Sequence, residues 1–308
     1  MRVAYLGNDP WSVPPLEALA AGTRHRVVLV VTREPRPAGR GGEPRTTAVA
    51  EAARRLRLPV VETRTVKEGE GLESLRDSTP EVLAVVAYGE ILPGEVLGLP
   101  RVAPINVHFS LLPALRGADP VRRAILQGLD ATGVTTMRMG EGLDTGPILL
   151  QAEEPIRDED DAGSLGGRLA ERGGRLLVET LDRLADGRIE ERPQDDGRAT
   201  WAPKLRPEEE WIDWSEPAEA VWRRVRALAP EPGARTRFRD RVLKVLRAAP
   251  VEAPGEPGSI VEASNRRLVV ACGAGAVALE EVVPEGRRRM AGADFARGRR
   301  PEVGERFA

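Results

Sequence analysis

Short apolar runs that alternate with helical segments restrict the fold of this 308-residue chain more than any other feature. Arg26–Thr32 and Val82–Val86 are nearly continuous apolar runs, which is the pattern of strands covered on both faces. Arg2–Gly7 begins the series as a further strand, and helices are predicted at Pro14–Ala21 and Thr46–Leu56. This β–α–β alternation predicts an α/β fold with a doubly wound parallel, Rossmann-like sheet.

The last hundred residues follow a different pattern. After a helix predicted at Pro217–Leu228, short apolar runs are separated by Gly, Pro and Asn, which predicts a small β-barrel. The stretch before this helix is polar, and a chain of this length suits two domains. We therefore expect a first domain at residues 1–190, a linker at 191–207 and a second domain at 208–308.

Composition excludes several classes of protein. The single cysteine, Cys272, rules out an internal disulfide and fits a reducing cytoplasm, and the absence of a Cys/His cluster predicts no metal site. The longest apolar run, Leu268–Leu279, is too short to cross a bilayer, so we expect no membrane partner. The sequence also lacks the glycine motifs of dinucleotide and P-loop sites.

Charge is distributed unevenly along the chain. Residues 220–308 hold 18 Lys+Arg and 11 Asp+Glu, a net charge of +7, and the remainder of the chain carries −9. A basic C-terminal part suits a partner with a phosphate backbone, although scattered arginines can also belong to a solvated surface.

Three polar side chains between Ile105 and Ile148 are candidates for chemistry. An apolar strand ends in Asn106 and His108, and a Gly-bounded loop later presents Asp144. The amide could stabilise an oxyanion, the imidazole could transfer a proton near neutral pH, and the carboxylate could orient the imidazole. By spacing alone, an Asn-x-His at the end of an apolar strand is more often structural than catalytic, and Leu-Asp-Thr-Gly is also compatible with an ordinary Asx turn. The chain has one other histidine, His25, in a charged stretch.

The surrounding motifs resemble a known family. N-V-H-x-S-L-L-P-x-x-R-G-x-x-P at residues 106–120 and G-L-D-T-G at 142–146 are similar to formyltransferases that use formyltetrahydrofolate. R-P-A-G-R-G at 36–41, V-V-A-Y-G-x-I-L-P at 85–93 and W-A-P-K-L-x-x-E-E-x-x-I-D-W at 201–214 extend the resemblance over nearly the whole chain. Together these stretches resemble the methionyl-tRNA formyltransferase family.

This resemblance implies transfer of the formyl group of 10-formyltetrahydrofolate to the α-amino group of initiator methionyl-tRNA during translation initiation. It implies that Asn106, His108 and Asp144 are catalytic and that the C-terminal barrel is an OB-like module that binds tRNA. Arg36 and Arg40 would contact the tRNA, no metal would be needed, and we expect a cytoplasmic monomer. The residues expected to bind folate are Tyr88, Ile91, Leu92, Ser110, Leu111, Leu112 and Pro113.

Other functions remain open at this point. A sugar-amine formyltransferase or a formyltetrahydrofolate hydrolase would keep the three polar residues but lack the 36–41 loop and the Ile212-Asp213-Trp214 stretch as they stand here. An RNA-binding protein with an inactive folate site would not need the three polar residues, so their presence argues against this alternative. The chain departs from the family at Phe109, which we expect to narrow the folate site, and at Ala114-Leu115, which could weaken a substrate contact.

Overall fold

The computed structural model describes residues 1–38 and 42–308. Contacts between residues divide the chain into two compact units. Unit 1 comprises residues 1–120, 131–155 and 166–203, and unit 2 comprises residues 121–130, 156–165 and 204–308. Residues 191–203, in the stretch where we expect a linker, therefore lie in unit 1.

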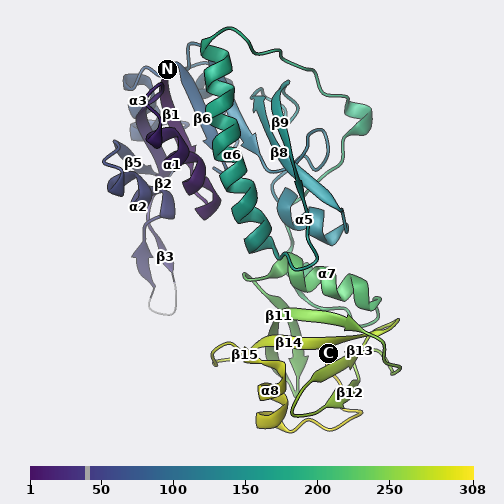
Figure 1. Cartoon of the computed structure of the whole chain (residues 1–308). Coiled ribbons are helices and arrows are strands. Elements are labelled where there is room, and N and C mark those ends of the chain that lie inside the picture. Colours follow the sequence, from purple (N-terminus) through teal and green to yellow (C-terminus); the bar gives the residue numbers. More distant parts are fainter. Residues whose placement is uncertain (39–41) are drawn as a thin grey trace. The chain divides into compact units, whose positions relative to one another are not determined.

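The predicted parallel sheet forms the centre of unit 1 (Figure 1). Among the described residues seven strands pair in the order β5-β2-β1-β6-β7-β8-β9, and the first five of these run parallel. The α/β, doubly wound fold class is thus confirmed. The strands are β1 (Arg2–Gly7), β2 (Arg26–Arg33), β5 (Val60–Thr63), β6 (Val82–Val86), β7 (Ala103–His108), β8 (Ala131–Arg138) and β9 (Ile148–Pro155).

Strands β8 and β9 depart from the parallel arrangement. β8 is antiparallel to β7, and β9 is antiparallel to β8. The chain reverses after β7 through a turn and the short helix α5 (Pro120–Leu126), which has only 7 residues. The hairpin between β8 and β9 creates the loop at 139–147 that carries Asp144.

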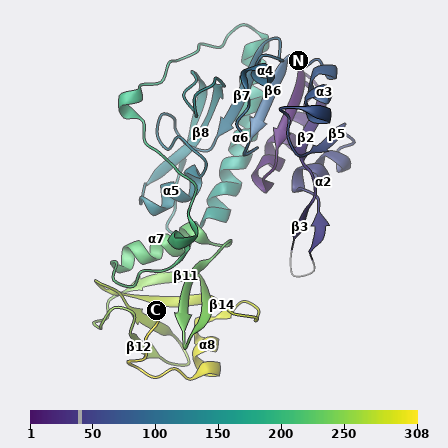
Figure 2. The same cartoon turned by 180° about the vertical axis from the view of Figure 1, so that it is seen from behind.

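Helices cover both faces of this sheet. Leu6 and Val85 of the sheet pack with Leu75 of α3 and Val96 of α4 on one face. Helix α6 passes in front of the other face in Figure 1, and Figure 2 shows the sheet from behind. The helices are α1 (Val13–Ala21), α2 (Ala48–Arg55), α3 (Gly69–Asp77), α4 (Gly94–Leu97) and α6 (Ala162–Ala185), with short 3-10 turns at Pro10–Ser12 and Asp196–Arg198, and a further 3-10 turn at Pro207–Glu210 belongs to unit 2.

The register of β7 decides which side chains can reach the site. Asn106 pairs with Val85, whose side chain belongs to the cluster under α3 and α4. Because side chains alternate along a strand, His108 shares this face and Phe109 lies on the opposite one. A Cβ added at Gly173 of α6 would lie 3.4 Å from the Phe109 ring, which agrees with this assignment.

Two further strands form a separate hairpin in unit 1. β3 (Arg36–Ala38) and β4 (Glu43–Arg45) pair antiparallel, and Arg36 is directly opposite Arg45. The hairpin projects away from the central sheet of the unit (Figure 1). Arg36 and Arg45 are both exposed, and Arg40 lies outside the described residues.

Unit 2 contains the predicted β-rich C-terminal part. Its antiparallel strands pair in the order β10-β11-β14-β13-β12, and β15 pairs with β14. The elements are α7 (Ala218–Leu228), β10 (Ala234–Phe238), β11 (Arg241–Val251), β12 (Ile260–Ala263), β13 (Leu268–Ala271), β14 (Ala276–Pro284), β15 (Met290–Ala291) and α8 (Gly292–Arg299).

The C-terminal residues connect the two edges of this sheet. Phe307 forms a bridge with Phe238 at the end of β10, and Arg306 forms a bridge with Ser259 before β12. The ring of Phe307 lies 5.0 Å from that of Phe238 and 5.9 Å from that of Trp214. The result is a small barrel, as expected from the sequence, and its largely aliphatic core includes the aromatic rings of Trp214, Phe238, Phe295 and Phe307. Among the described residues no helix is long and apolar enough to cross a membrane.

Neighbouring glycines in α6 provide a test of this packing. A Cβ at Gly166 would lie 2.2 Å from two ring carbons of Trp11, whereas one at Gly167 would meet no described atom within 4 Å. We expect Gly166→Ala to lower the unfolding free energy by about 1–3 kcal/mol through overpacking. Gly167→Ala should be neutral or stabilise by up to about 1 kcal/mol through helix propensity. Thermal unfolding measures both, and equal melting temperatures would contradict the packing of Trp11 on α6.

Candidate active site

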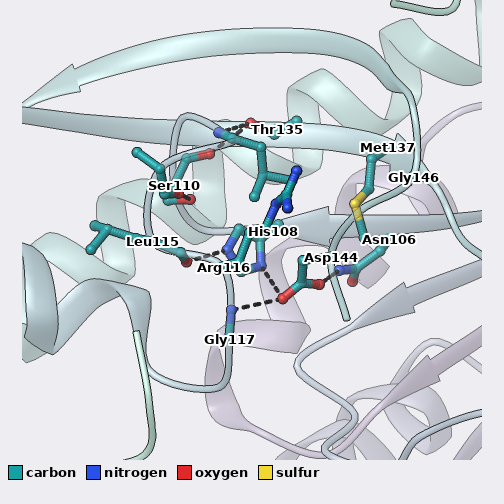
Figure 3. A network of polar contacts seen from close by, with 12 residues as sticks. Asn106, His108, Ser110, Leu115, Arg116, Gly117, Thr135, Met137, Asp144 and Gly146 are labelled. Atoms are coloured by element: carbon teal, nitrogen blue, oxygen red, sulfur yellow. Dashed lines mark hydrogen bonds and ion pairs between the residues drawn. The ribbon is translucent and has the colours of Figure 1, made fainter. Parts of the chain in front are cut away.

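The carboxylate of Asp144 is the centre of a polar cluster (Figure 3). Its Oδ2 accepts a hydrogen bond from the backbone N–H of Gly117 at 2.9 Å and lies 3.7 Å from Nδ1 of His108. Its Oδ1 lies 3.4 Å from Nδ2 of Asn106. Asp144 is 9% exposed and His108 5% exposed, so these contacts are largely shielded from water. The structure therefore brings the three predicted catalytic residues together.

The hydrogen bond on the far side of the His108 ring fixes its tautomer. Nε2 lies 2.9 Å from the backbone carbonyl oxygen of Leu115. A carbonyl can only accept, so Nε2 must carry a hydrogen in both the neutral and the charged imidazole. Nδ1, which faces Asp144, is then the nitrogen that gains or loses a proton. When Nδ1 is protonated, His108 and Asp144 form an ion pair that is shielded from water.

Asn106 contributes a donor on the same face of β7. An amide NH₂ group has two hydrogens, so the contact with Asp144 leaves one free to bind an oxygen of a reacting group. Asn106 is half-buried at the carboxyl end of β7, where open α/β sheets bind their ligands. The amide and Nδ1 of His108 flank the carboxylate, an arrangement suited to stabilising negative charge on a bound carbonyl oxygen.

Backbone geometry in the loop after β8 explains the G-L-D-T-G sequence. Asp144 has a φ of +53°, in the left-handed region that Asp tolerates better than most residues. A Cβ at Gly146 would lie 1.8 Å from the carbonyl oxygen of Arg138, so only glycine fits there. These two requirements hold the loop against β8 and turn the carboxylate toward β7.

The turn after β7 is internally hydrogen bonded. The Ser110 hydroxyl donates to the carbonyl of Ala114 at 2.6 Å, and the Thr135 hydroxyl donates to the carbonyl of Ser110 at 2.7 Å. Ser110 has no exposed surface, which disfavours a role as a nucleophile. Leu112 is also buried and packs with Met137 and Ile148.

The remaining residues expected to bind folate differ in exposure. Tyr88 and Leu92 are buried in the cluster under α3 and α4, and burial together with the nearby Glu90 raises the pKa of the Tyr88 hydroxyl. Ile91 is 77% exposed, and Leu111 and Pro113 are half-buried. Ile91, Leu111 and Pro113 are therefore the members of the set that present surface to a ligand.

The two departures from the family pattern have structural roles. The buried ring of Phe109 contacts Trp11 edge-on, with the ring centroids 6.2 Å apart, on the α6 side of the sheet. Phe109 thus packs away from Asn106 and His108, and our expectation that it narrows a folate site is wrong. Leu115 has a φ of +59° and supplies the carbonyl that binds His108.

Sequence reasoning did not identify Gln194 as part of the site. Its Nε2 donates to the backbone carbonyls of Asp144 at 2.8 Å and of Gly146 at 2.7 Å. Its Oε1 accepts two hydrogen bonds from Arg116, at 3.0 and 2.8 Å. Gln194 lies in a polar stretch without a motif. The signal that points to it appears only in the structure, where Arg116 is 3% exposed and its guanidinium needs a buried acceptor.

Family comparison agrees with this geometry. Residues 1–181 match the formyl transferase family, and residues 204–300 match the formyl transferase C-terminal domain. The methionyl-tRNA formyltransferase of Thermus thermophilus is 45% identical over 298 residues, which cover 97% of this chain and 96% of that protein.

Solved structures with the same fold have more distant sequences. HypX from Aquifex aeolicus, in complex with tetrahydrofolic acid, matches with a TM-score of 0.67 at 18% identity over 99% of this chain and 48% of HypX, so the chain spans about half of HypX. An N-formyltransferase from Helicobacter canadensis, in complex with folinic acid and dTDP-3-aminofucose, matches with a TM-score of 0.65 at 17% identity over 90% of this chain and 98% of that one. These structural matches support the fold. The 45% identity with the Thermus thermophilus enzyme identifies the group within the family. The chain belongs to the formyl transferase family and, within it, to the methionyl-tRNA formyltransferases.

Proposed function

We propose that the chain transfers the formyl group of 10-formyltetrahydrofolate to the α-amino group of initiator methionyl-tRNA in the cytoplasm. The observation that carries the proposal is the convergence of Asn106, His108 and Asp144 at the end of β7 in a chain of this family. Direct transfer needs an oxyanion donor and a proton carrier. It needs no covalent nucleophile, and the hydroxyl of Ser110 is occupied within its own turn.

The reaction follows from the chemistry of these groups. An α-amino group has an ordinary pKa near ~8, so much of it is already neutral and nucleophilic. Its nitrogen attacks the formyl carbon, and the carbonyl oxygen becomes an oxyanion that the Asn106 amide and the protonated Nδ1 of His108 stabilise. The bond between this carbon and N10 of the folate then breaks. As it breaks, Nδ1 of His108 gives its proton to N10, and the proton lost by the amine then restores Nδ1, directly or through a water molecule held by Asp144.

Folate would bind along the side chains that remain available near this site. Ile91 is exposed after β6, and Leu111 and Pro113 are half-buried in the turn after β7. Both segments follow the carboxyl ends of adjacent parallel strands, where a flat ligand can lie across the sheet edge. The buried Tyr88, Leu92, Ser110 and Leu112 would support this surface from beneath.

The tRNA would contact basic groups of both units. Arg36 and Arg45 face each other on the exposed β3–β4 hairpin of unit 1. In unit 2 several arginines already have carboxylate partners, such as Arg239 with Glu305 at 2.8 Å, so fewer positive groups are free than the 18 Lys+Arg of residues 220–308 suggest. Arg241 and Lys244 of β11 have no ion-pair partner among the described residues and are candidates for phosphate contacts.

Kinetics of the three central residues test the mechanism. We expect His108→Ala to lower kcat by about two to four decades, because a general acid–base is lost. Asn106→Ala should lower kcat by about two to three decades, because an oxyanion donor is lost. The double variant should lose less than the product of the two effects, since the residues act together.

The assay uses radiolabelled formyl transfer to charged initiator tRNA, with elongator tRNA and a sugar amine as alternative acceptors. His25→Ala is the matched control, because His25 pairs with Asp182 away from the site and should leave kcat unchanged. Near-normal turnover of His108→Ala would contradict the mechanism. If the unmodified protein formylated the sugar amine in preference to the tRNA, the chain would have a different substrate.

The hairpin contact can be tested with a salt titration of tRNA binding. We expect Arg36→Gln to weaken binding and to reduce the slope of log affinity against log salt by about 0.7–0.9, the value for one phosphate contact. Arg57→Gln removes the same charge from another exposed position of unit 1 and should change neither quantity. Identical slopes for the Arg36 variant and the unmodified protein would remove Arg36 from the tRNA-binding surface.

A further inference from the structure

A segment distant in sequence from the catalytic motifs runs beside both loops of the active site. We call residues 192–202 the bracing segment. It begins with reciprocal backbone hydrogen bonds between Arg192 and Ile148, at 2.8 and 2.9 Å. It ends with backbone hydrogen bonds between Arg116 and both Thr200 and Ala202, at 2.8 and 2.7 Å. The bracing segment is therefore tied to β9 after the Asp144 loop and also to the turn after β7.

Gln194 uses the hydrogen-bonding groups of its amide to connect these two loops. The NH₂ group donates to the carbonyls of Asp144 and Gly146, and the oxygen accepts from the Nε and Nη2 of Arg116. Carbonyls only accept and a guanidinium only donates, so the partners fix the orientation of the amide. The Gln194 side chain thus connects the backbone of Asp144 to Arg116. Arg116 precedes Gly117, and the backbone N–H of Gly117 binds the Asp144 carboxylate.

The buried charge of Arg116 strengthens this connection. Arg116 is 3% exposed, and it reaches Gln194 as well as Asp196 at 2.7 Å, whose side chain is 83% exposed. Hydrogen bonds from a charged donor are shorter and stronger than neutral ones. Removing the acceptor at Gln194 would leave part of a buried guanidinium without a partner, which proteins rarely tolerate.

Thr200 supports the other half of the site. Its hydroxyl accepts the backbone N–H of Leu115 at 2.8 Å, and Leu115 has a φ of +59°. The carbonyl of this same residue accepts Nε2 of His108. An unfavourable backbone conformation persists where its surroundings fix it. Thr200 therefore helps to fix the carbonyl that sets the His108 tautomer.

We propose that Gln194 is a positioning residue that holds the Asp144 carboxylate in register with His108, and that Thr200 assists through Leu115. Gln194 touches no reacting atom in this proposal and acts through the backbone of Asp144. A misplacement of about 1 Å at a catalytic group can cost on the order of 10²-fold in rate. We therefore expect loss of Gln194 to lower kcat by about 10- to 100-fold while the KM for each substrate stays within about twofold.

The kinetic test rests on the proposed function and uses the full chain. Gln194→Ala removes the side chain, and Gln194→Met keeps its approximate volume without its hydrogen bonds, in case the smaller residue impairs folding. Arg198→Gln is the matched control on the same segment, because the Arg198 side chain is exposed and has no hydrogen-bond or ion-pair partner among the described residues. Thr200→Val should lower kcat in the same way, and Thr200→Ser should restore it.

A double-mutant cycle separates positioning from a general loss of structure. In an Asp144→Asn background, Gln194→Met should cause little further loss, since the group it positions is already disabled. Single-turnover assays, with the protein in excess over the tRNA, allow the low rate of the Asp144→Asn variant to be measured. An undiminished further loss in the Asp144→Asn background would overturn the proposal.

A second readout does not depend on any substrate. The chain has two histidines, so the ¹⁵N resonances of the His108 ring can be assigned by their absence from His108→Ala, with His25 as an internal reference. We expect Gln194→Met and Asp144→Asn to shift the Nδ1 resonance of His108 in the same direction, and Arg198→Gln to leave it in place. An unmoved resonance in Gln194→Met would overturn the positioning role. If the unmodified protein failed to formylate methionyl-tRNA, the proposed function would fail while this measurement still tested the positioning role.

Discussion

The site depends on how one nearly buried carboxylate is compensated. A carboxylate away from water is stable only when donors surround it. Asp144 meets an amide and an imidazole from β7 and a backbone N–H from the turn that follows, so three segments must be in place together. This requirement explains the left-handed backbone at Asp144 and the glycine at 146. The fold of unit 1 can be understood as the scaffold that keeps these donors in reach.

Much of this arrangement could be predicted from sequence, because its signals are local. Buried apolar runs identified the central strands, and the family motifs identified Asn106, His108 and Asp144. The direction of β8 could not be predicted, because apolar patterning does not encode whether a strand runs parallel or antiparallel to its neighbour. Gln194 could not be found because its role arises from contacts across about 50–80 residues, at a position with no sequence motif.

One error was avoidable. In I-N-V-H-F the two-residue period already places Phe109 on the opposite face from Asn106 and His108. In a strand, the residue that follows a catalytic histidine therefore points to the opposite face and need not contact the ligand. The C-terminal charge count had a similar weakness, since it counts residues irrespective of partners. Arg224 pairs with Glu216 and Arg235 with Glu210, both at 2.9 Å, and these two carboxylates lie before residue 220, so the uncompensated charge of residues 220–308 is smaller than +7.

The closure of the small barrel by residues 304–308 has a consequence for behaviour in solution. An open strand edge presents unpaired N–H and C=O groups that recruit strands of other molecules. Here Arg237 and Ala308 exchange backbone hydrogen bonds at 2.7 and 3.0 Å, and Ile260 bonds with Glu305 and Gly304 at 2.7 and 2.9 Å. Both edge strands are thereby occupied from within the chain. A β-rich unit closed in this way can thus resist edge-to-edge aggregation when its concentration is high.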